Sequence, residues 1–150
     1  MIQQLDERLK AWRDRPIEGQ LAYVSLDGIW LKLSWGGEVK NVAVLVAIGV
    51  DQDGFRQVLG VAEGIKDDGA SRRNFLRHLK ERGLQGVLLV TSDKWLGLVE
   101  ALGEFYPDAD WQRCMVHWQQ NVGSAVPRSK RPEAMAMLKA IHAQEDRQAR

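Results

Sequence analysis

The order of apolar and polar residues divides the chain into a helical start, three strands, and then alternating helices and strands. Residues Met1–Asp14 carry apolar side chains at helical spacing, which predicts a short helix. The segments Leu21–Leu33, Val42–Val50 and Phe55–Ala62 are rich in β-branched and apolar residues, which favour strands. Because these three strands follow one another along the chain, we predict an antiparallel meander.

From Ser71 onwards the spacing of apolar residues becomes helical. Phe75, Leu76 and Leu79 fall on one side of this helix, and Gly83 is a plausible C-terminal cap. The basic residues fall elsewhere: Arg72, Arg73, Arg77 and Lys80. We therefore predict an amphipathic helix whose basic outside could contact the DNA backbone.

The remaining chain continues this alternation. The apolar run Val87–Val90 suits a strand covered on both faces, and a helical pattern from Trp95 to Phe105 follows it. Ala109–Arg113 predicts one more short strand, and two further helices come after it, one ending at Pro127 and one running from Pro132 to His142. This element order fits an α/β fold with a ribonuclease-H-like mixed sheet, although the order alone is compatible with other α/β folds.

Composition adds local rather than global information. The chain has 150 residues, and 21 Lys and Arg against 20 Asp and Glu give a formal charge of +1, so overall charge does not indicate a nucleic-acid partner. Cys114 is the single cysteine and excludes an internal disulfide. Neither a signal peptide nor a membrane-spanning run is evident, so we expect a cytoplasmic protein without a membrane partner.

Two aspartates are candidates for metal chemistry. Asp27 lies inside an apolar strand pattern, on one face with Ile29, Leu31 and Leu33, where an isolated carboxylate is costly to bury. Asp93 directly follows the Val87–Val90 strand, and strand ends commonly carry active-site groups in α/β sheets. Such a pair could hold Mg²⁺ for phosphodiester chemistry.

Structural roles account for the same residues, and on the residues alone we favour them. Asp27 could end a strand where Gly28 turns the chain, and Asp93 could cap the following helix. Cys114 and His117 have a metal-like spacing, but one Cys and one His cannot complete a zinc site. They could instead be a buried thiol and a packed imidazole beside a tryptophan. The chain has no recognisable nucleophile motif and no phosphate-cradling glycine loop.

Six sequence blocks resemble the mutator-type transposases of bacterial insertion sequences and occur in the family's order. They are Arg15–Gly19, Leu26–Gly28, Val44–Val50, Leu79–Leu84, Ser92–Asp93 and Trp111–His117. The similarity extends from about Asp14 to Gln144, and the final block is its most specific part. It implies a DDE transposase with a ribonuclease-H-like catalytic core.

The resemblance also implies roles for individual residues. Asp27 and Asp93 match the first two acidic members of the catalytic triad, which bind Mg²⁺ or Mn²⁺, and Cys114 and His117 match the family's Cys-x-x-His signature. Metal-activated water would cut a strand at the element's end, and the freed 3′-hydroxyl would attack target DNA. The partner implied is DNA. Separately from the resemblance, we expect self-association, because truncation would expose core surface, or contact with a full-length transposase.

Three departures from the family pattern lead us to expect a truncated and individually inactive copy. The catalytic Glu of the family lies well beyond the Cys-x-x-His block, and neither Glu133 nor Glu145 fits its position. The family's DNA-recognition helices would lie upstream of Met1. Lys94 and Trp95 stand where the family usually has a small residue and then His.

The expected organisation has three parts: a helix and linker over residues 1–19, a partial catalytic core over residues 20–126, and the start of a helical insertion over residues 127–150. Two alternatives remain open at this point. The chain could be a non-catalytic module that contacts DNA or a full-length transposase through its basic segments, or a neighbouring polypeptide could supply the missing Glu.

Overall fold

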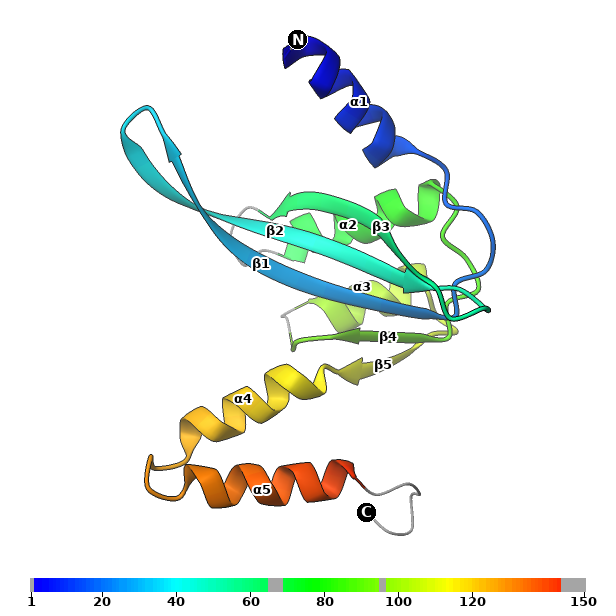
Figure 1. Cartoon of the computed structure of the whole chain (residues 1–150). Coiled ribbons are helices and arrows are strands. Elements are labelled where there is room, and N and C mark those ends of the chain that lie inside the picture. Colours follow the sequence, from blue (N-terminus) through cyan, green and yellow to red (C-terminus); the bar gives the residue numbers. More distant parts are fainter. Residues whose placement is uncertain (1, 65–68, 95–96, 144–150) are drawn as a thin grey trace. The chain divides into compact units, whose positions relative to one another are not determined.

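The computed structural model describes residues 2–64, 69–94 and 97–143. The chain divides into two compact units, Met1–Gln112 and Arg113–Arg150, and each is described by itself (Figure 1). The expected domain limits at residues 19 and 126 stay predictions. None of the described helices is both long and apolar enough to cross a membrane.

A mixed five-stranded sheet forms the framework of the first unit. Its strands stand in the order β3-β2-β1-β4-β5. They are β1 (Tyr23–Trp35), β2 (Glu38–Val50), β3 (Arg56–Gly64), β4 (Leu89–Ser92) and β5 (Asp110–Arg113). The pairs β1–β2 and β2–β3 are antiparallel, whereas β1 and β4 are parallel. The predicted α/β class and the meander of three strands followed by a parallel strand are therefore confirmed.

The described residues form five helices, close to where the apolar spacing predicts them. They are α1 (Ile2–Asp14), α2 (Gly69–Glu81), α3 (Leu98–Phe105), α4 (Met115–Ala125) and α5 (Arg131–His142). The predicted start of the third helix at Trp95 lies outside the described residues. In Figure 1, α2 and α3 lie behind the sheet, on the face where the apolar core forms.

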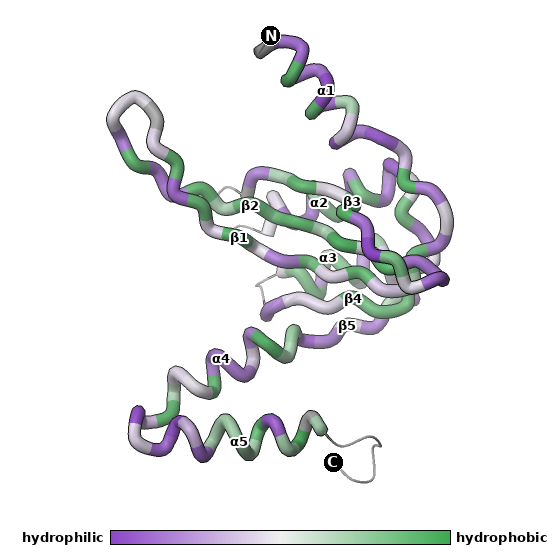
Figure 2. The backbone as a smooth tube through the Cα atoms, in the orientation of Figure 1, coloured by the Kyte–Doolittle hydropathy of each residue, from purple (hydrophilic) through white to green (hydrophobic). Residues whose placement is uncertain are grey.

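Alternating side chains of the strands explain this core. Val24 and Leu26 of β1 are buried, as are Leu45 and Ala47 of β2, with which they share a face. Phe75, Leu76 and Leu79 of α2 and Leu98, Ala101 and Leu102 of α3 pack against this side of the sheet. In Figure 2 the tube of β2 is mostly green, whereas β1 alternates between green and paler or purple segments. Every second residue of these strands and one face of α2 therefore pack together in one core.

The predicted strand Val87–Val90 needs a correction. The structure places β4 at Leu89–Ser92, because pairing with β1 begins only at the register pair Tyr23↔Leu89. The N–H groups of Leu88 and Leu89 both donate to the carbonyl oxygen of Ala22, so Leu88 lies before the regular ladder. Its side chain is 59% exposed, so the expectation of an apolar run covered on both faces is wrong at this residue.

The linker before β1 is locked to the turn after α2. The Ile17 N–H donates to the carbonyl oxygen of Arg82 at 2.7 Å. The buried Arg82 guanidinium donates through Nε to Arg15 O at 2.8 Å and through Nη1 to Leu59 O at 2.7 Å. Burial, with the Arg15 charge nearby and against the opposing effect of Asp14, lowers the pKa of Arg82. Two of the sequence blocks, Arg15–Gly19 and Leu79–Leu84, thus hold each other in place.

Candidate metal centre

Asp27 and Asp93 occupy matching places on two neighbouring parallel strands. The last register pair between β1 and β4 is Leu26↔Ser92, and each aspartate is the next residue along its chain. Leu26 and Ser92 are both buried in the core, and side chains alternate along strands. The two aspartates therefore directly follow one register pair, which places their backbones side by side on neighbouring strands.

The two carboxylates also share a hydrogen-bond pattern. Oδ1 of Asp27 accepts a bond of 2.8 Å from the Gly28 N–H, and Oδ1 of Asp93 accepts one of 2.8 Å from the Lys94 N–H. Both aspartates are partly exposed. A carboxylate that is half-buried and held by a backbone donor is oriented without being sealed from solvent, which suits a metal ligand.

The donor set of the pair fits a hard divalent cation. Mg²⁺ commonly takes one or two carboxylates from the protein and fills its remaining positions with water and phosphate oxygens. Among the residues that the structure describes, no group of three or more His, Cys, Asp or Glu side chains could hold a metal ion. Within the described residues the candidate site therefore has two carboxylates, and no complete zinc site is found.

Asp93 is joined to the sheet edge by side chains that sequence reasoning did not single out. The Trp111 Nε1–H donates to Ser92 Oγ at 2.9 Å, and Ser92 Oγ donates to the carbonyl oxygen of Asp93 at 2.8 Å. Trp111 belongs to β5, at the edge of the sheet beside β4. Their presence in the Ser92–Asp93 and Trp111–His117 blocks was the available sequence signal, but the blocks carry no spatial information.

Arg72 requires a correction. The helical pattern placed it outside the apolar side of α2, yet only 7% of its surface is exposed. It lines a small cavity with Leu26, Asp27, Leu45, Val46, Phe75, Leu76 and Leu98. Because residues three and four apart share a helix face, Arg72 stands one turn before Phe75 and Leu76 and is carried into the interior with them. The expectation that Arg72 lies on an exposed basic face is wrong.

The other three basic residues of α2 are exposed but have partners within the first unit. Arg73 forms an ion pair with Glu104 of α3 at 3.1 Å, and Lys80 Nζ donates to the carbonyl oxygen of Phe105 at 2.7 Å. Arg77 Nη1 donates to Asn74 Oδ1 at 3.1 Å, and its guanidinium lies over the Phe105 ring. Apart from the bond to Asn74, which lies within α2, these contacts join α2 to the end of α3. A role for Arg73, Arg77 and Lys80 in DNA binding stays a prediction.

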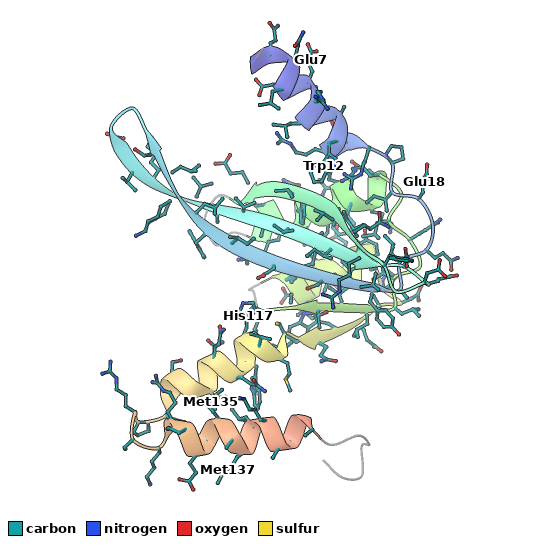
Figure 3. All side chains as sticks on the ribbon, in the orientation of Figure 1. Glu7, Trp12, Glu18, His117, Met135 and Met137 are labelled. Carbon is teal, nitrogen blue, oxygen red and sulfur yellow. The ribbon has the colours of Figure 1, made fainter. Side chains whose placement is uncertain are left out.

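Cys114 and His117 belong to the second unit. Cys114 is the residue before α4 and accepts a bond of 3.0 Å from the Trp118 N–H through its carbonyl oxygen, while His117 lies in the first turn of the helix (Figure 3). Both side chains are half-buried. Their spacing places them one helical turn apart, as expected for a Cys-x-x-His pair at a helix start.

Comparison with known proteins decides the family. The profile described as "Transposase, Mutator family" matches residues 1–150. The chain belongs to the mutator family of transposases. This confirms the resemblance that the sequence blocks indicate.

Named relatives of this mutator-family chain are transposases of insertion sequences. The transposase for insertion sequence element IS1081 of Mycobacterium tuberculosis is 40% identical over 147 residues, which are 97% of this chain and 35% of that protein. The transposase for ISRM5 of Rhizobium meliloti is 42% identical over 142 residues, 95% of this chain and 36% of that protein. The transposase for IS256 in transposon Tn4001 of Staphylococcus aureus is 30% identical over 142 residues, 94% of this chain and 36% of that protein.

The mutator-family chain thus spans about a third of the length of these relatives. Among solved structures, a chain of the simian T-cell lymphotropic virus intasome in complex with PP2A regulatory subunit B56 gamma has a TM-score of 0.39 at 10% identity, covering 84% of this chain and 50% of that chain. That likeness is too distant to bear on the fold or the site.

Proposed function

We propose that Asp27 and Asp93 hold a divalent metal ion, Mg²⁺ or Mn²⁺, in the catalytic core of a transposase that cuts and joins DNA strands. The observation that carries this proposal is the placement of two half-buried carboxylates directly after the last register pair of adjacent parallel strands. Membership of the mutator family supports it. The ribonuclease-H-like character of the core belongs to the same proposal.

The metal would supply Lewis-acid activation of water and of phosphate oxygens when it is bound. The chain's own residues would hold and orient the metal. Asp27 and Asp93 would provide oxygen ligands, and the N–H groups of Gly28 and Lys94 fix one carboxylate oxygen of Asp27 and of Asp93, respectively. DNA at the ends of an insertion sequence and at the target is the proposed substrate, in the cytoplasm of the host cell. Cys114 and His117 keep the signature role that the family resemblance implies.

We propose that the chain alone binds its metal weakly and does not complete strand transfer. No third acidic, Cys or His side chain joins Asp27 and Asp93 within the described residues. A site with fewer charged ligands holds Mg²⁺ or Ca²⁺ less tightly. A carboxylate from another polypeptide would complete the site, which makes a second transposase chain the proposed partner.

The competing function is that of a non-catalytic module bound to DNA through the basic face of α2. The structure gives this reading less support than the sequence does, because Arg72 is buried and Arg73, Arg77 and Lys80 contact groups of α2 and α3. Such a module would bind DNA without metal, and its affinity would fall with salt.

Binding of a fluorescent DNA duplex, followed by anisotropy with and without Mn²⁺ or Ca²⁺, tests the proposal. We expect the metal to increase the affinity several-fold, and Asp27→Asn/Asp93→Asn to abolish this increase, because a metal held by the two carboxylates would supply positive charge that attracts phosphate. The matched control Asp108→Asn changes an exposed aspartate after α3 and should leave the increase intact. Metal-independent binding that is equal in all variants would instead support the interaction module.

A further inference from the structure

Ser92 is a polar residue in a place where a hydroxyl is normally costly. Its side chain is 1% exposed and faces the core on the same side of the sheet as Leu26. Both hydrogen-bonding functions are used, since Ser92 Oγ accepts from Trp111 Nε1 at 2.9 Å and donates to Asp93 O at 2.8 Å. Satisfying both functions offsets the desolvation of the buried hydroxyl. The hydroxyl therefore has a defined direction.

That direction determines the orientation of the peptide group between Asp93 and Lys94. The carbonyl oxygen that Ser92 binds and the Lys94 N–H belong to one planar peptide group, so fixing one fixes the other. The same N–H donates to Oδ1 of Asp93 at 2.8 Å. A continuous series of hydrogen bonds thus runs from the Trp111 indole through Ser92 and a single peptide plane to the Asp93 carboxylate. Hydrogen bonds in such a series strengthen one another.

The backbone after Asp27 is held differently from the backbone after Asp93. Its carboxylate accepts from the Gly28 N–H, but Gly28 lies inside the long β1–β2 ladder, opposite Leu45. The backbone after Asp27 is therefore held by strand pairing on the β2 side. Asp93, in contrast, follows the last residue of the short strand β4, where the ladder has ended. The side-chain bonds replace the missing strand partner at this point.

Trp111 is well placed to anchor this series of hydrogen bonds. It comes from the edge strand β5 and packs against the apolar core, so its indole is held by the fold and not by the site. The Asp110 N–H donates to the carbonyl oxygen of Leu88 at 2.8 Å, which ties β5 to the backbone just before β4. The bond between Trp111 and Ser92 therefore connects the core to the peptide that orients Asp93.

We infer that Ser92 and Trp111 are positioning residues that hold the Asp93 carboxylate in its metal-binding orientation. The inference rests on the proposed metal site, but its structural half, the control of the Asp93–Lys94 peptide, is separately measurable. A merely structural role would loosen the sheet edge generally. A positioning role changes the Lys94 amide and spares the equivalent Gly28 amide beside Asp27.

Two variants separate these roles. Trp111→Phe removes the indole donor and keeps an aromatic ring, and Ser92→Ala removes the hydroxyl. Trp30→Phe and Ser34→Ala are the matched controls, since both residues are exposed on β1. Amide proton shifts and hydrogen exchange of Lys94 and Gly28 are followed by NMR on the whole chain, and Mn²⁺ affinity is measured on the same samples.

We expect both variants to shift the Lys94 amide and speed its exchange, to leave Gly28 unchanged, and to weaken Mn²⁺ binding by about tenfold, the lower end for residues that support metal ligands. Three outcomes would overturn the inference: an unchanged Lys94 amide, equal changes at Gly28 and Lys94, or unchanged Mn²⁺ affinity despite a shifted Lys94 amide. Failure of the wild-type chain to bind Mn²⁺ would overturn the proposed function, and with it the metal-binding half of the inference, while the selective shift at Lys94 would still establish the control of the peptide.

Discussion

Asp27 and Asp93 are held in the same manner at equivalent places on two parallel strands: each accepts a 2.8 Å hydrogen bond at Oδ1 from the N–H of the next residue. Each also directly follows a member of the register pair Leu26↔Ser92. Because the strands are adjacent, this register places the two aspartates next to each other along neighbouring strands. The proposed metal site thus depends on strand register, and the fold that fixes this register is open to direct tests.

Gly83 tests the contact between the linker and the turn after α2. It has a φ of +104°, and a Cβ atom there would lie 2.8 Å from the carbonyl oxygen of Ile17. Gly83→Ala should therefore lower the free energy of unfolding by about 1–3 kcal/mol. Gly103→Ala is the control, since nothing lies within 4 Å of its Cβ position, and in helix α3 it should raise stability by about 0.5–1 kcal/mol. Equal changes in the free energy of unfolding for Gly83→Ala and Gly103→Ala, measured by urea unfolding, would contradict the close contact between Gly83 and Ile17.

Arg82 tests the hydrogen bonds that hold the same linker. Arg82→Met removes the donors to Arg15 O and Leu59 O and should lower the free energy of unfolding by about 2–4 kcal/mol, because buried carbonyl groups lose charged partners. The exposed Arg56 at the start of β3 provides the control Arg56→Met. Similar urea midpoints for the two variants would show that the Arg82 hydrogen bonds make no net contribution to the free energy of unfolding.

Tyr106 makes stability depend on alkaline pH. Burial raises the pKa of its hydroxyl above the ordinary value of 10.0, and the hydroxyl has no hydrogen-bond partner within the described residues. Above about pH 10 the unfolded chain ionises this group while the folded chain keeps it protonated, so unfolding is favoured as pH rises. Tyr106→Phe should therefore lose less stability between pH 9 and 11 than the wild type, and gain about 1 kcal/mol at pH 7. Parallel pH profiles from thermal unfolding would contradict this.

The basic face of α2 is tested by salt. If Arg73 and Arg77 contact phosphates, Arg73→Gln/Arg77→Gln should reduce the slope of log affinity against log salt by about 2, at roughly 0.9 per contact. If they serve only to join α2 and α3, the slope stays constant and stability falls instead. DNA anisotropy at several salt concentrations, alongside thermal unfolding, separates the two roles. The control Arg8→Gln/Lys10→Gln lies on the exposed helix α1.

Sequence patterns predict the order and type of the elements well, because strands β1 to β3 and helix α2 are long and strongly periodic. Sequence patterns do not predict the burial of Arg72. A charged residue at this helix position is expected to face solvent, but its long side chain lines an interior cavity together with Asp27. The beginning of β4 is also missed, because register with β1 and not apolar content decides where pairing starts. The connection from Trp111 to Ser92 spans 19 residues and depends on the neighbouring places of β4 and β5.

Direct measurement of Mn²⁺ binding by electron paramagnetic resonance tests the metal centre most simply. The wild-type chain and the Asp108→Asn control should bind Mn²⁺ alike, whereas Asp27→Asn and Asp93→Asn should each weaken binding by about tenfold or more, because each removes one charged oxygen ligand. Their combination should leave only nonspecific binding. Equal Mn²⁺ affinity in the wild type and the double variant would contradict a metal site at Asp27 and Asp93.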